Sequence, residues 1–300
     1  MNNRRAFLKQ LGFSALSLSA MGGLAFEACA SSQKPYFFDI SLAQWSFHKS
    51  LFAKKMDNLD FAETAAKQFG IQAVEYVNQF FKDKAKDQAY LKEMLKRAQD
   101  NGVTNVEIMI DGEGDLGSTE ITARKKAVEN HYKWVEAAKL LGCKSIRVNA
   151  AGKGTAEEVK AAAIESLHTL SEFAAPYAIN IMVENHGGLS SNGQWLSAVL
   201  KEVNLENCGT LPDFGNFYEY DPYQGVADMM PFAKGVSAKS YDFDAEGNET
   251  KIDYFKMMKI VKDAGFKGYI GIEYEGDRLS EEEGIKKTKL LLEKVGAALG

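Results

Sequence analysis

The sequence predicts a single closed (β/α)8 barrel, on three observations. From residue 36 onward, short apolar runs alternate with longer amphipathic stretches. This alternation, with short connections, is typical of parallel βα units. Eight such units in about 260 residues match the size of a closed barrel. An open doubly wound sheet is the alternative, but no GxGxxG-type loop follows the first predicted strand. No internal linker separates the units, so we expect one domain over residues 36–300.

The eight predicted strands are apolar runs that end in polar residues. They are DISLAQWS (39–46), AVEYVNQFF (73–81), TNVEIMID (104–111), SIRVNAAG (145–152), INIMVEN (179–185), GTLPDFG (209–215), GVSAKSYDF (235–243) and YIGIEYEG (269–276).

The predicted helices lie between these strands. Residues 83–100 and 155–178 carry apolar residues at three- and four-residue spacing, with Lys and Glu on the other faces. A glycine follows several helical stretches, where a left-handed C-terminal cap favours this residue. These glycines are Gly70, Gly102, Gly142 and Gly265.

The composition excludes some partner classes. The chain has 300 residues, is 45% hydrophobic and 26% charged, and carries a formal net charge of −5. A mildly acidic globular chain gives no reason to expect nucleic acid or a membrane surface as partner. Cys143 and Cys208 fall at the starts of predicted strands, and we expect both to be buried free thiols rather than a disulfide framework.

Residues 1–30 are predicted to be a cleavable twin-arginine-type export signal. Asn3 to Lys9 carries the arginine pair, and the apolar stretch from Leu11 to Phe26 is interrupted by serines and glycines. It is too short for a membrane span of about 20 residues. Cys29 stands where a bacterial lipobox cysteine would, although Ala28 to Ala30 could equally direct soluble release. We therefore expect an exported protein, either periplasmic or lipid-anchored.

Polar residues gather at the C-terminal ends of the predicted strands, where barrels of this kind carry their chemistry. Period-two alternation places Arg147 with Asn149, Glu184 with His186, Ser237 with Lys239 and Glu273 with Glu275 on one face of each strand. A closed barrel directs one such face toward its axis. Several strands are therefore expected to direct charge at one place.

Glu184, Asp213 and Glu273 are the candidate catalytic carboxylates. Three converging carboxylates cannot all stay ionised in a partly dry cavity without a compensating cation. A divalent metal with oxygen ligands, Mn²⁺ or Mg²⁺, is one solution. Neutralisation by Lys239, Arg147 and protonated His186 is the other. Either array suits removal of a proton next to a sugar carbonyl and stabilisation of the resulting enediolate.

Four segments carry a family resemblance: VENHGG (183–188), LPDFGNF (211–217), VSAKSYDF (236–243) and GYIGIEYEG (268–276). With them, residues 36–300 resemble the xylose isomerase-like TIM barrel superfamily, in particular its sugar phosphate isomerase/epimerase members. The resemblance implies that Glu184, Asp213 and Glu273 bind one divalent metal. It also implies that Glu184 and Glu273 act as acid and base.

The chain departs from the family pattern at two positions. Ser237 stands where a metal-binding His is expected, and Asn216 where the epimerases often carry another His. Serine is a poor ligand beside imidazole, so the metal is expected to be weaker, completed by water, or absent with Lys239 supplying the positive charge. No glycine-rich phosphate loop is evident, which favours an unphosphorylated sugar or keto-sugar as substrate.

The remaining candidate residues are assigned as follows. Lys239 and His186 join Glu184 and Glu273 as catalytic candidates, because His186 precedes a Gly-Gly pair where backbone and ligand can approach closely. The predicted substrate contacts are Gln44, Trp45, Glu75, Arg147, Asn149 and Asn216. Among these, Arg147 and Asn149 form a fork for sugar hydroxyls, and Trp45 could stack on a sugar face.

These residues favour a sugar isomerase or epimerase that acts through an enediolate. A lyase on keto-glycosides shares the first step and stays open, as does a non-catalytic sugar-binding barrel. A phosphodiesterase-type hydrolase is disfavoured, because it needs a His-rich multi-zinc site. The chain has four histidines, and His131 and His168 lie on predicted helices. The oligomeric state is left open, with a homo-oligomer as one outcome.

Overall fold

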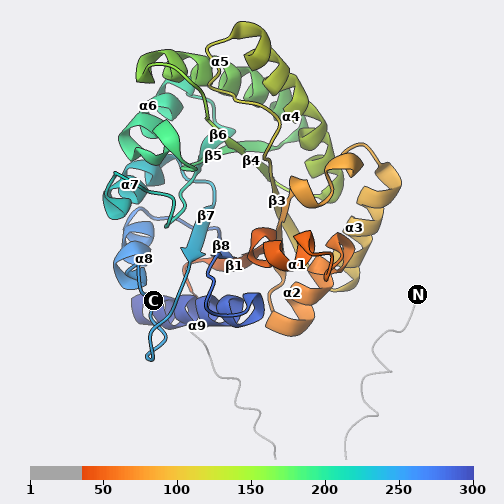
Figure 1. Cartoon of the computed structure of the whole chain (residues 1–300), viewed down its shortest axis with the longest axis vertical. Coiled ribbons are helices and arrows are strands. Elements are labelled where there is room, and N and C mark those ends of the chain that lie inside the picture. Colours follow the sequence, from red (N-terminus) through yellow and green to blue (C-terminus); the bar gives the residue numbers. More distant parts are fainter. Residues whose placement is uncertain (1–35) are drawn as a thin grey trace, which may run out of the picture. The chain divides into compact units, whose positions relative to one another are not determined.

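The computed structural model describes residues 36–300, so the export signal predicted for residues 1–30 lies outside the described residues. The eight strands are β1 (Asp39–Ala43), β2 (Ala73–Val77), β3 (Thr104–Met109), β4 (Ser145–Asn149), β5 (Asn180–Glu184), β6 (Cys208–Leu211), β7 (Val236–Ser240) and β8 (Tyr269–Tyr274). The helices are α1 (His48–Phe52), α2 (Phe61–Phe69), α3 (Gln88–Asp100), α4 (Ile121–Leu141), α5 (Ala156–Ala174), α6 (Gly193–Val203), α7 (Pro222–Met229), α8 (Tyr254–Asp263) and α9 (Glu281–Leu299). The helices form a ring around the strands (Figure 1).

The strands form one parallel sheet that curls into a near-closed barrel. Its order is β6-β5-β4-β3-β2-β1-β8-β7. Isolated bridges, not a continuous ladder, join β6 to β7, and one of them pairs Asp213 with Ser237. The Ser237 amide donates to the Pro212 carbonyl at 2.9 Å, and the Phe214 amide donates to the Ser237 carbonyl at 3.1 Å. The predicted eight-stranded parallel barrel is confirmed, with this seam as its loosest part.

The strands end earlier than the sequence predicts. Residues Gln44–Phe47 form a 3₁₀ turn after β1, and Asn78–Phe80 form another after β2. Asp213 and Glu275 likewise lie beyond the last paired residues of β6 and β8. The apolar pattern continues past β1 because the turn stays buried, with Phe47 in the main core and Ser46 bonded to the β8 backbone. Sequence pattern therefore overestimated the length of the ladder.

Helix ends follow the capping chemistry. The Asp87 side chain accepts from the Tyr90 amide, so α3 begins at Gln88 rather than at residue 83. A capping box between Thr155 and Glu158 begins α5. All four glycines predicted as helix caps adopt positive φ: Gly70, Gly102, Gly142 and Gly265. The predicted glycine caps are confirmed.

The two faces of the sheet differ in chemistry. Strand residues such as Leu42, Val74 and Ile146 face the helices and belong to the main apolar core. The alternate residues face the barrel axis, and most of them are polar and buried: Ser41, Glu75, Glu107, Arg147, Glu184, Ser237, Lys239 and Glu273. A small separate cluster of Ala43, Val77 and Met109 supplies apolar packing inside the barrel. The interior is thus packed around charge.

Glu75 and Glu107 form the lower part of this polar interior. They are register partners on β2 and β3, and they are 3% and 1% exposed. Ser41 donates to Glu75 Oε1 at 2.5 Å, while Glu107 Oε1 has no hydrogen-bond partner. The Glu75 carboxyl lies against Gly271, where an added Cβ would lie 2.2 Å from Oε2. Gly271 therefore provides the space that Glu75 occupies.

The described residues also bear on the predictions about the cysteines and about membrane spans. Cys143 and Cys208 are buried and free, as predicted. Across residues 36–300, none of the helices combines the length and apolarity that a membrane crossing requires.

Gly271→Ala is expected to lower the free energy of unfolding by about 1–3 kcal/mol, because overpacking forces the Glu75 carboxyl away from Ser41. In the double variant Glu75→Ala/Gly271→Ala, the cost of the Gly271 change should shrink, because the colliding carboxyl is gone. Urea unfolding of the four proteins of this cycle gives the coupling. Strictly additive effects would contradict the close approach.

Candidate active site

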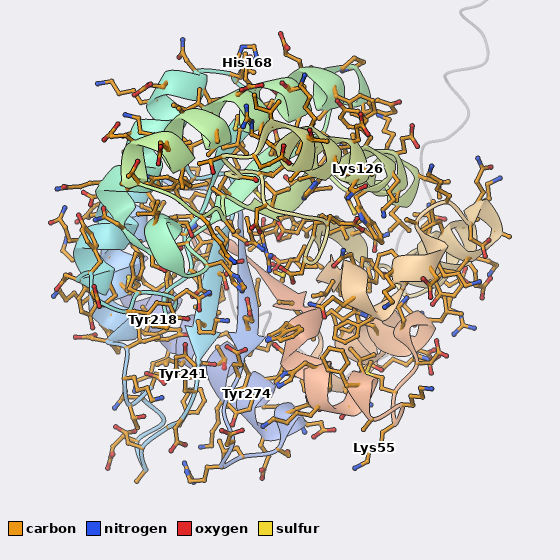
Figure 2. The ribbon with its side chains drawn as sticks, turned by 45° about the horizontal axis from the view of Figure 1, so that its top comes forward. Lys55, Lys126, His168, Tyr218, Tyr241 and Tyr274 are labelled. Atoms are coloured by element: carbon orange, nitrogen blue, oxygen red, sulfur yellow. The ribbon has the colours of Figure 1, made fainter. Side chains whose placement is uncertain are left out.

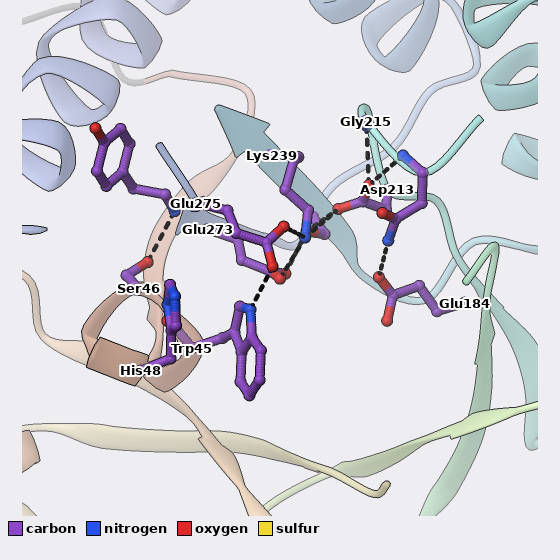
Figure 3. Close-up of polar contacts among 12 residues, drawn as sticks. Trp45, Ser46, His48, Glu184, Asp213, Gly215, Lys239, Glu273 and Glu275 are labelled. Carbon is purple, nitrogen blue, oxygen red and sulfur yellow. Dashed lines mark hydrogen bonds and ion pairs between the residues drawn. The ribbon is translucent and has the colours of Figure 1, made fainter. Parts of the chain in front are cut away.

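Three carboxylates converge at the C-terminal end of the barrel. Glu184 ends β5, Asp213 follows β6 and Glu273 lies on β8, and one oxygen from each lies within 4.8 Å of the others. They are 1%, 0% and 4% exposed. Figure 3 shows Lys239 between Glu273 and Asp213, with Glu184 next to Asp213. Residues far apart in sequence thus meet because parallel strands end at the same edge.

Lys239 supplies a positive charge to this cluster. Its Nζ donates to Glu273 Oε1 at 2.6 Å and to Glu275 Oε2 at 3.0 Å, and lies 4.0 Å from Asp213 Oδ2. The side chain is 2% exposed. Burial works against its charged form, but the surrounding carboxylates hold the Lys239 pKa well above its ordinary value. Lys239 therefore stays an ammonium ion.

Ser237 and the loop after β6 fix the orientation of Asp213. Ser237 Oγ lies 2.6 Å from Asp213 Oδ2 and 3.0 Å from Glu273 Oε2. One hydroxyl carries one proton, so it donates to one of them at a time. The Gly215 and Asn216 amides both donate to Asp213 Oδ1 at 2.8 Å. Asp213 is thus held by its own loop and by β7.

Arg147 forms the second positive centre. Its Nη1 donates to Asp111 Oδ1 at 2.8 Å, and Asn149 Nδ2 donates to the same oxygen at 2.8 Å. Its Nε lies 2.7 Å from Glu184 Oε2, but without hydrogen-bond alignment, so both atoms lack a hydrogen-bond partner. Asn216 Nδ2 donates to Glu184 Oε1 at 3.0 Å. Arg147 thus spans two carboxylates.

The pKa values of the carboxylates diverge. Burial raises the pKa of Glu184 to about 7 despite Arg147, and burial raises that of Asp213 to about 7 despite Lys239. Burial also opposes ionisation of Glu273, but Lys239 outweighs it and holds the Glu273 pKa below its ordinary value. Two positive charges are therefore insufficient to keep all three carboxylates ionised near neutral pH.

Not every predicted contact residue reaches this cluster. Gln44 is fully buried, and its amide binds Asn58 and the Val77 backbone at 2.8 and 2.9 Å. Its place is therefore within the β1–β2 wall. Glu75 lies deeper in the barrel, bonded to Ser41.

Trp45, Arg147, Asn149 and Asn216 are each bonded to a residue of the site. His186 is exposed on the loop after β5, and its backbone amide donates to Ser190 Oγ at 3.0 Å. It therefore lies at the rim rather than among the carboxylates.

Asp111 and Glu275 are site residues to which the sequence assigned no role. Asp111 binds Arg147 and Asn149. Glu275 binds Lys239, and it also accepts from Trp45 Nε1 at 2.7 Å. Each follows a strand end, and this position was the available signal. Their partners lie on other strands, which sequence pattern does not pair.

The two helix-borne histidines lie outside the site, in agreement with their predicted positions. His131 is buried in α4 with Nδ1 2.7 Å from the Ala127 carbonyl. His168 lies on the outer side of α5 (Figure 2), beside Glu172.

A hollow of 540 Å³ lies at the rim of the barrel. It is bordered by Gly188 and Tyr218 from the loops after β5 and β6.

The residues present fit a divalent cation with oxygen ligands. Glu184, Asp213 and Glu273 each offer an oxygen to one point, and Glu184 Oε2 is buried without a hydrogen-bond partner. Burial raises the pKa of both Glu184 and Asp213, and a bound cation would favour their ionised forms. Because the neighbouring Ser237 offers a hydroxyl and no imidazole, the donor set suits a hard cation such as Mg²⁺ or Mn²⁺ better than Zn²⁺.

Comparison with known proteins identifies the family. The model of the xylose isomerase-like TIM barrel family matches residues 64–295. The chain therefore belongs to this family.

Several solved structures share the fold. The IOLI protein with a bound zinc atom has a TM-score of 0.70 and 16% identity, over 87% of this chain and 98% of that one. A sugar phosphate isomerase/epimerase from Parabacteroides distasonis has a TM-score of 0.67 and 16% identity, over 90% and 97%. The 3-keto-D-glucoside 4-epimerase from E. coli has a TM-score of 0.62 and 14% identity, over 87% and 99%. At these identities the likeness establishes the fold.

One curated relative adds a short match. The C-glycoside deglycosidase alpha subunit from Arthrobacter globiformis is 32% identical over 66 residues, which are 22% of this chain. The match spans about a fifth of that subunit, 19% of its length.

Stability is expected to fall as pH rises, partly because of Glu75. Burial raises the pKa of Glu75 to about 8, outweighing the bond from Ser41. Between the ordinary glutamate pKa of about 4.3 and this value, the folded chain retains a proton that the unfolded chain releases, so unfolding becomes easier as pH rises. Glu75→Gln should reduce the dependence of the free energy of unfolding on pH, measured by urea unfolding between these two pKa values. Surface Glu202→Gln serves as control, and an unchanged slope in Glu75→Gln would contradict the neutral carboxyl.

The cation fit can be tested by calorimetric titration of chelator-treated protein with Mn²⁺ and Zn²⁺. Asp213→Asn should weaken Mn²⁺ binding by at least about tenfold, since even an outer-shell change costs that much. Glu275 is a neighbouring carboxylate outside the trio, so the Glu275→Gln variant should bind Mn²⁺ with an affinity closer to that of the parent chain. Ser237→His should raise the affinity for Zn²⁺ more than that for Mn²⁺, because imidazole suits zinc. Equal binding by all variants would place the cation elsewhere.

Proposed function

We propose that this protein is a sugar isomerase or epimerase that removes a proton next to a carbonyl and proceeds through an enediolate. The observation that carries the proposal is the buried trio of Glu184, Asp213 and Glu273 with an ammonium ion at its edge. Such an array is costly to bury and contributes little to packing. It suits a reaction that creates negative charge on a substrate oxygen.

The two glutamates have different proton affinities, which suits opposite roles. Lys239 keeps Glu273 ionised, so Glu273 is the carboxylate that is free to accept a proton. Glu184, with its pKa raised to about 7, is the better acid. A divalent cation bound by the trio would supply electrostatic stabilisation of the enediolate oxygens. Lys239 lies close enough to share that task.

The surrounding polar groups suit sugar hydroxyls. Arg147 and Asn149 are held in one orientation by Asp111, and Asn216 is held by Glu184. Preorganised amide and guanidinium groups bind hydroxyls without further ordering. His186, exposed at the rim, would contact the part of a bound substrate that extends out of the barrel mouth.

An unphosphorylated substrate fits the charges of the site. Lys239 is paired with Glu273 and Glu275, and Arg147 with Glu184 and Asp111. Neither cation is left for a phosphate.

The export signal predicted for residues 1–30 favours the same substrate class. It would place the enzyme in the periplasm or on a lipid anchor, where an enzyme would rarely meet sugar phosphates. Fractionation of cells expressing the full chain, with Arg4→Lys/Arg5→Lys as control, tests the location.

A lyase acting on keto-glycosides is the second candidate. The short match to a C-glycoside deglycosidase subunit favours it. The same proton abstraction next to a carbonyl generates a carbanion, and the electron pair can then expel the substituent on the neighbouring carbon. The two outcomes therefore share Glu184, Glu273 and Lys239, and differ in whether the aglycone leaves.

The test is exchange of the α-proton in D₂O, followed by NMR across keto- and aldo-sugars and keto-glycosides, with and without Mn²⁺. Glu184→Gln and Glu273→Gln should each lower the exchange rate by about 10²–10⁴, the usual contribution of a general acid or base. Glu202→Gln on the outer surface should exchange at the parent rate. A new stereoisomer identifies the epimerase, and a released aglycone identifies the lyase.

Absence of exchange on every sugar, with sugar binding retained, would overturn the enzymatic proposal in favour of a sugar-binding barrel. If Glu184→Gln and Glu273→Gln both exchange the α-proton at the parent rate, the acid–base assignment alone is contradicted.

A further inference from the structure

Four aromatic side chains form a wall at the barrel mouth: Trp45, His48, Phe52 and Phe80. Trp45 stacks on His48 with ring centroids 5.0 Å apart, and Phe52 meets Trp45 and Phe80 at 5.9 and 5.1 Å. Trp45 and Phe80 also pack on the small apolar cluster inside the barrel. These residues follow β1 and β2, so the wall lies at the same end of the barrel as the carboxylates.

The wall is joined to the site by a single residue. Trp45 Nε1 donates to Glu275 Oε1 at 2.7 Å, and Glu275 Oε2 accepts from Lys239 at 3.0 Å. Figure 3 shows Trp45 and His48 beside Glu275, with Glu273 and Lys239 next to them. A ligand in the carboxylate cluster would therefore have this aromatic surface as its neighbour.

The wall exposes more apolar surface than packing requires. Phe52 is 56% exposed, and Phe80 and Trp45 are half-buried. Phe52 and Phe80 border a hollow of 410 Å³ whose lining is partly apolar, with Leu51, Met56 and Tyr90, and partly polar, with Lys54, Asp57, Asn58 and Gln79. That volume falls in the range of roughly 300–1,000 Å³ typical of small-molecule sites. An exposed aromatic ring that continues a cluster of half-buried aromatic rings, next to charged side chains, is typical of a binding surface.

We propose that this wall binds an aromatic aglycone, so that the substrates are aryl glycosides whose sugar ring lies in the carboxylate cluster. The inference rests on the proposed function, because the sugar position follows from it. A planar ring can stack on or meet the edges of Trp45, Phe52 and Phe80. Trp45 lies between Glu275 on one side and Phe52 and Phe80 on the other, an order that matches a molecule with a polar ring at one end and an aromatic ring at the other. The short match to a C-glycoside deglycosidase subunit is consistent with a glycoside substrate.

The experiment compares binding of phenyl and methyl 3-keto-β-D-glucopyranosides to the full chain by calorimetry. The phenyl compound is expected to bind about tenfold more tightly, the scale of aromatic contacts. Phe52→Ala and Phe80→Ala should remove most of this preference and leave methyl-glycoside binding unchanged. Phe52→Leu, which keeps an apolar side chain without the ring, should retain part of it. Phe255→Ala on α8, where the ring is 39% exposed, is the matched control and should keep the full preference.

Equal affinity for the two compounds, failure of both to bind, or a preference untouched by Phe52→Ala and Phe80→Ala would overturn the aglycone site. The α-proton exchange assay on the same samples separates the two proposals. A phenyl preference without exchange would leave the binding site and remove the enzymatic function. α-Proton exchange without a phenyl preference would leave the enzymatic function and remove the aglycone site.

Discussion

The ion pair between Lys239 and Glu273 is the interaction on which the polar interior depends. A barrel axis lined by carboxylates is poorly hydrated, so every ionised group there needs a partner of opposite charge. Lys239 pairs with Glu273 and Glu275, and Arg147 pairs with Asp111 and, in part, with Glu184. Removing either cation would leave several buried anions and would affect the fold and the site together.

The same constraint explains why the acids differ from one another. Glu273, which is in direct contact with Lys239, has its pKa held below the ordinary value. Burial raises the pKa of Glu184 to about 7 even beside Arg147, and that of Glu75, which has no ion-pair partner among the described residues, to about 8. The barrel interior thereby holds carboxyls of raised pKa and carboxyls of lowered pKa together. Ser237 adds to this balance, because its neutral hydroxyl, in place of an imidazole, leaves the group of possible metal ligands made of oxygen alone. The fold and the charges of the candidate site thus arise from one distribution of charge.

Much of the fold was predictable because it repeats. Eight alternations of apolar strand and amphipathic helix are visible in the sequence, and glycine caps such as Gly70 and Gly142 end helices where expected. The strand ends were less predictable, since the turn at Gln44–Phe47 keeps an apolar pattern while leaving the sheet. Gln44 shows the consequence. Its amide was expected to meet substrate and instead joins Asn58 to the β2 backbone.

The sequence by itself determined which residue types stand at the strand ends, and hence that Glu184, Asp213 and Glu273 are candidates for one cluster. Tertiary structure alone decided the partners. That Trp45 binds Glu275 across 230 positions, or that Glu75 fills the space over Gly271, depends on the curvature and stagger of the sheet. Local periodicity specifies the face of a strand on which a side chain lies. It does not specify the residue opposite, because that neighbour comes from a distant segment brought near by barrel closure.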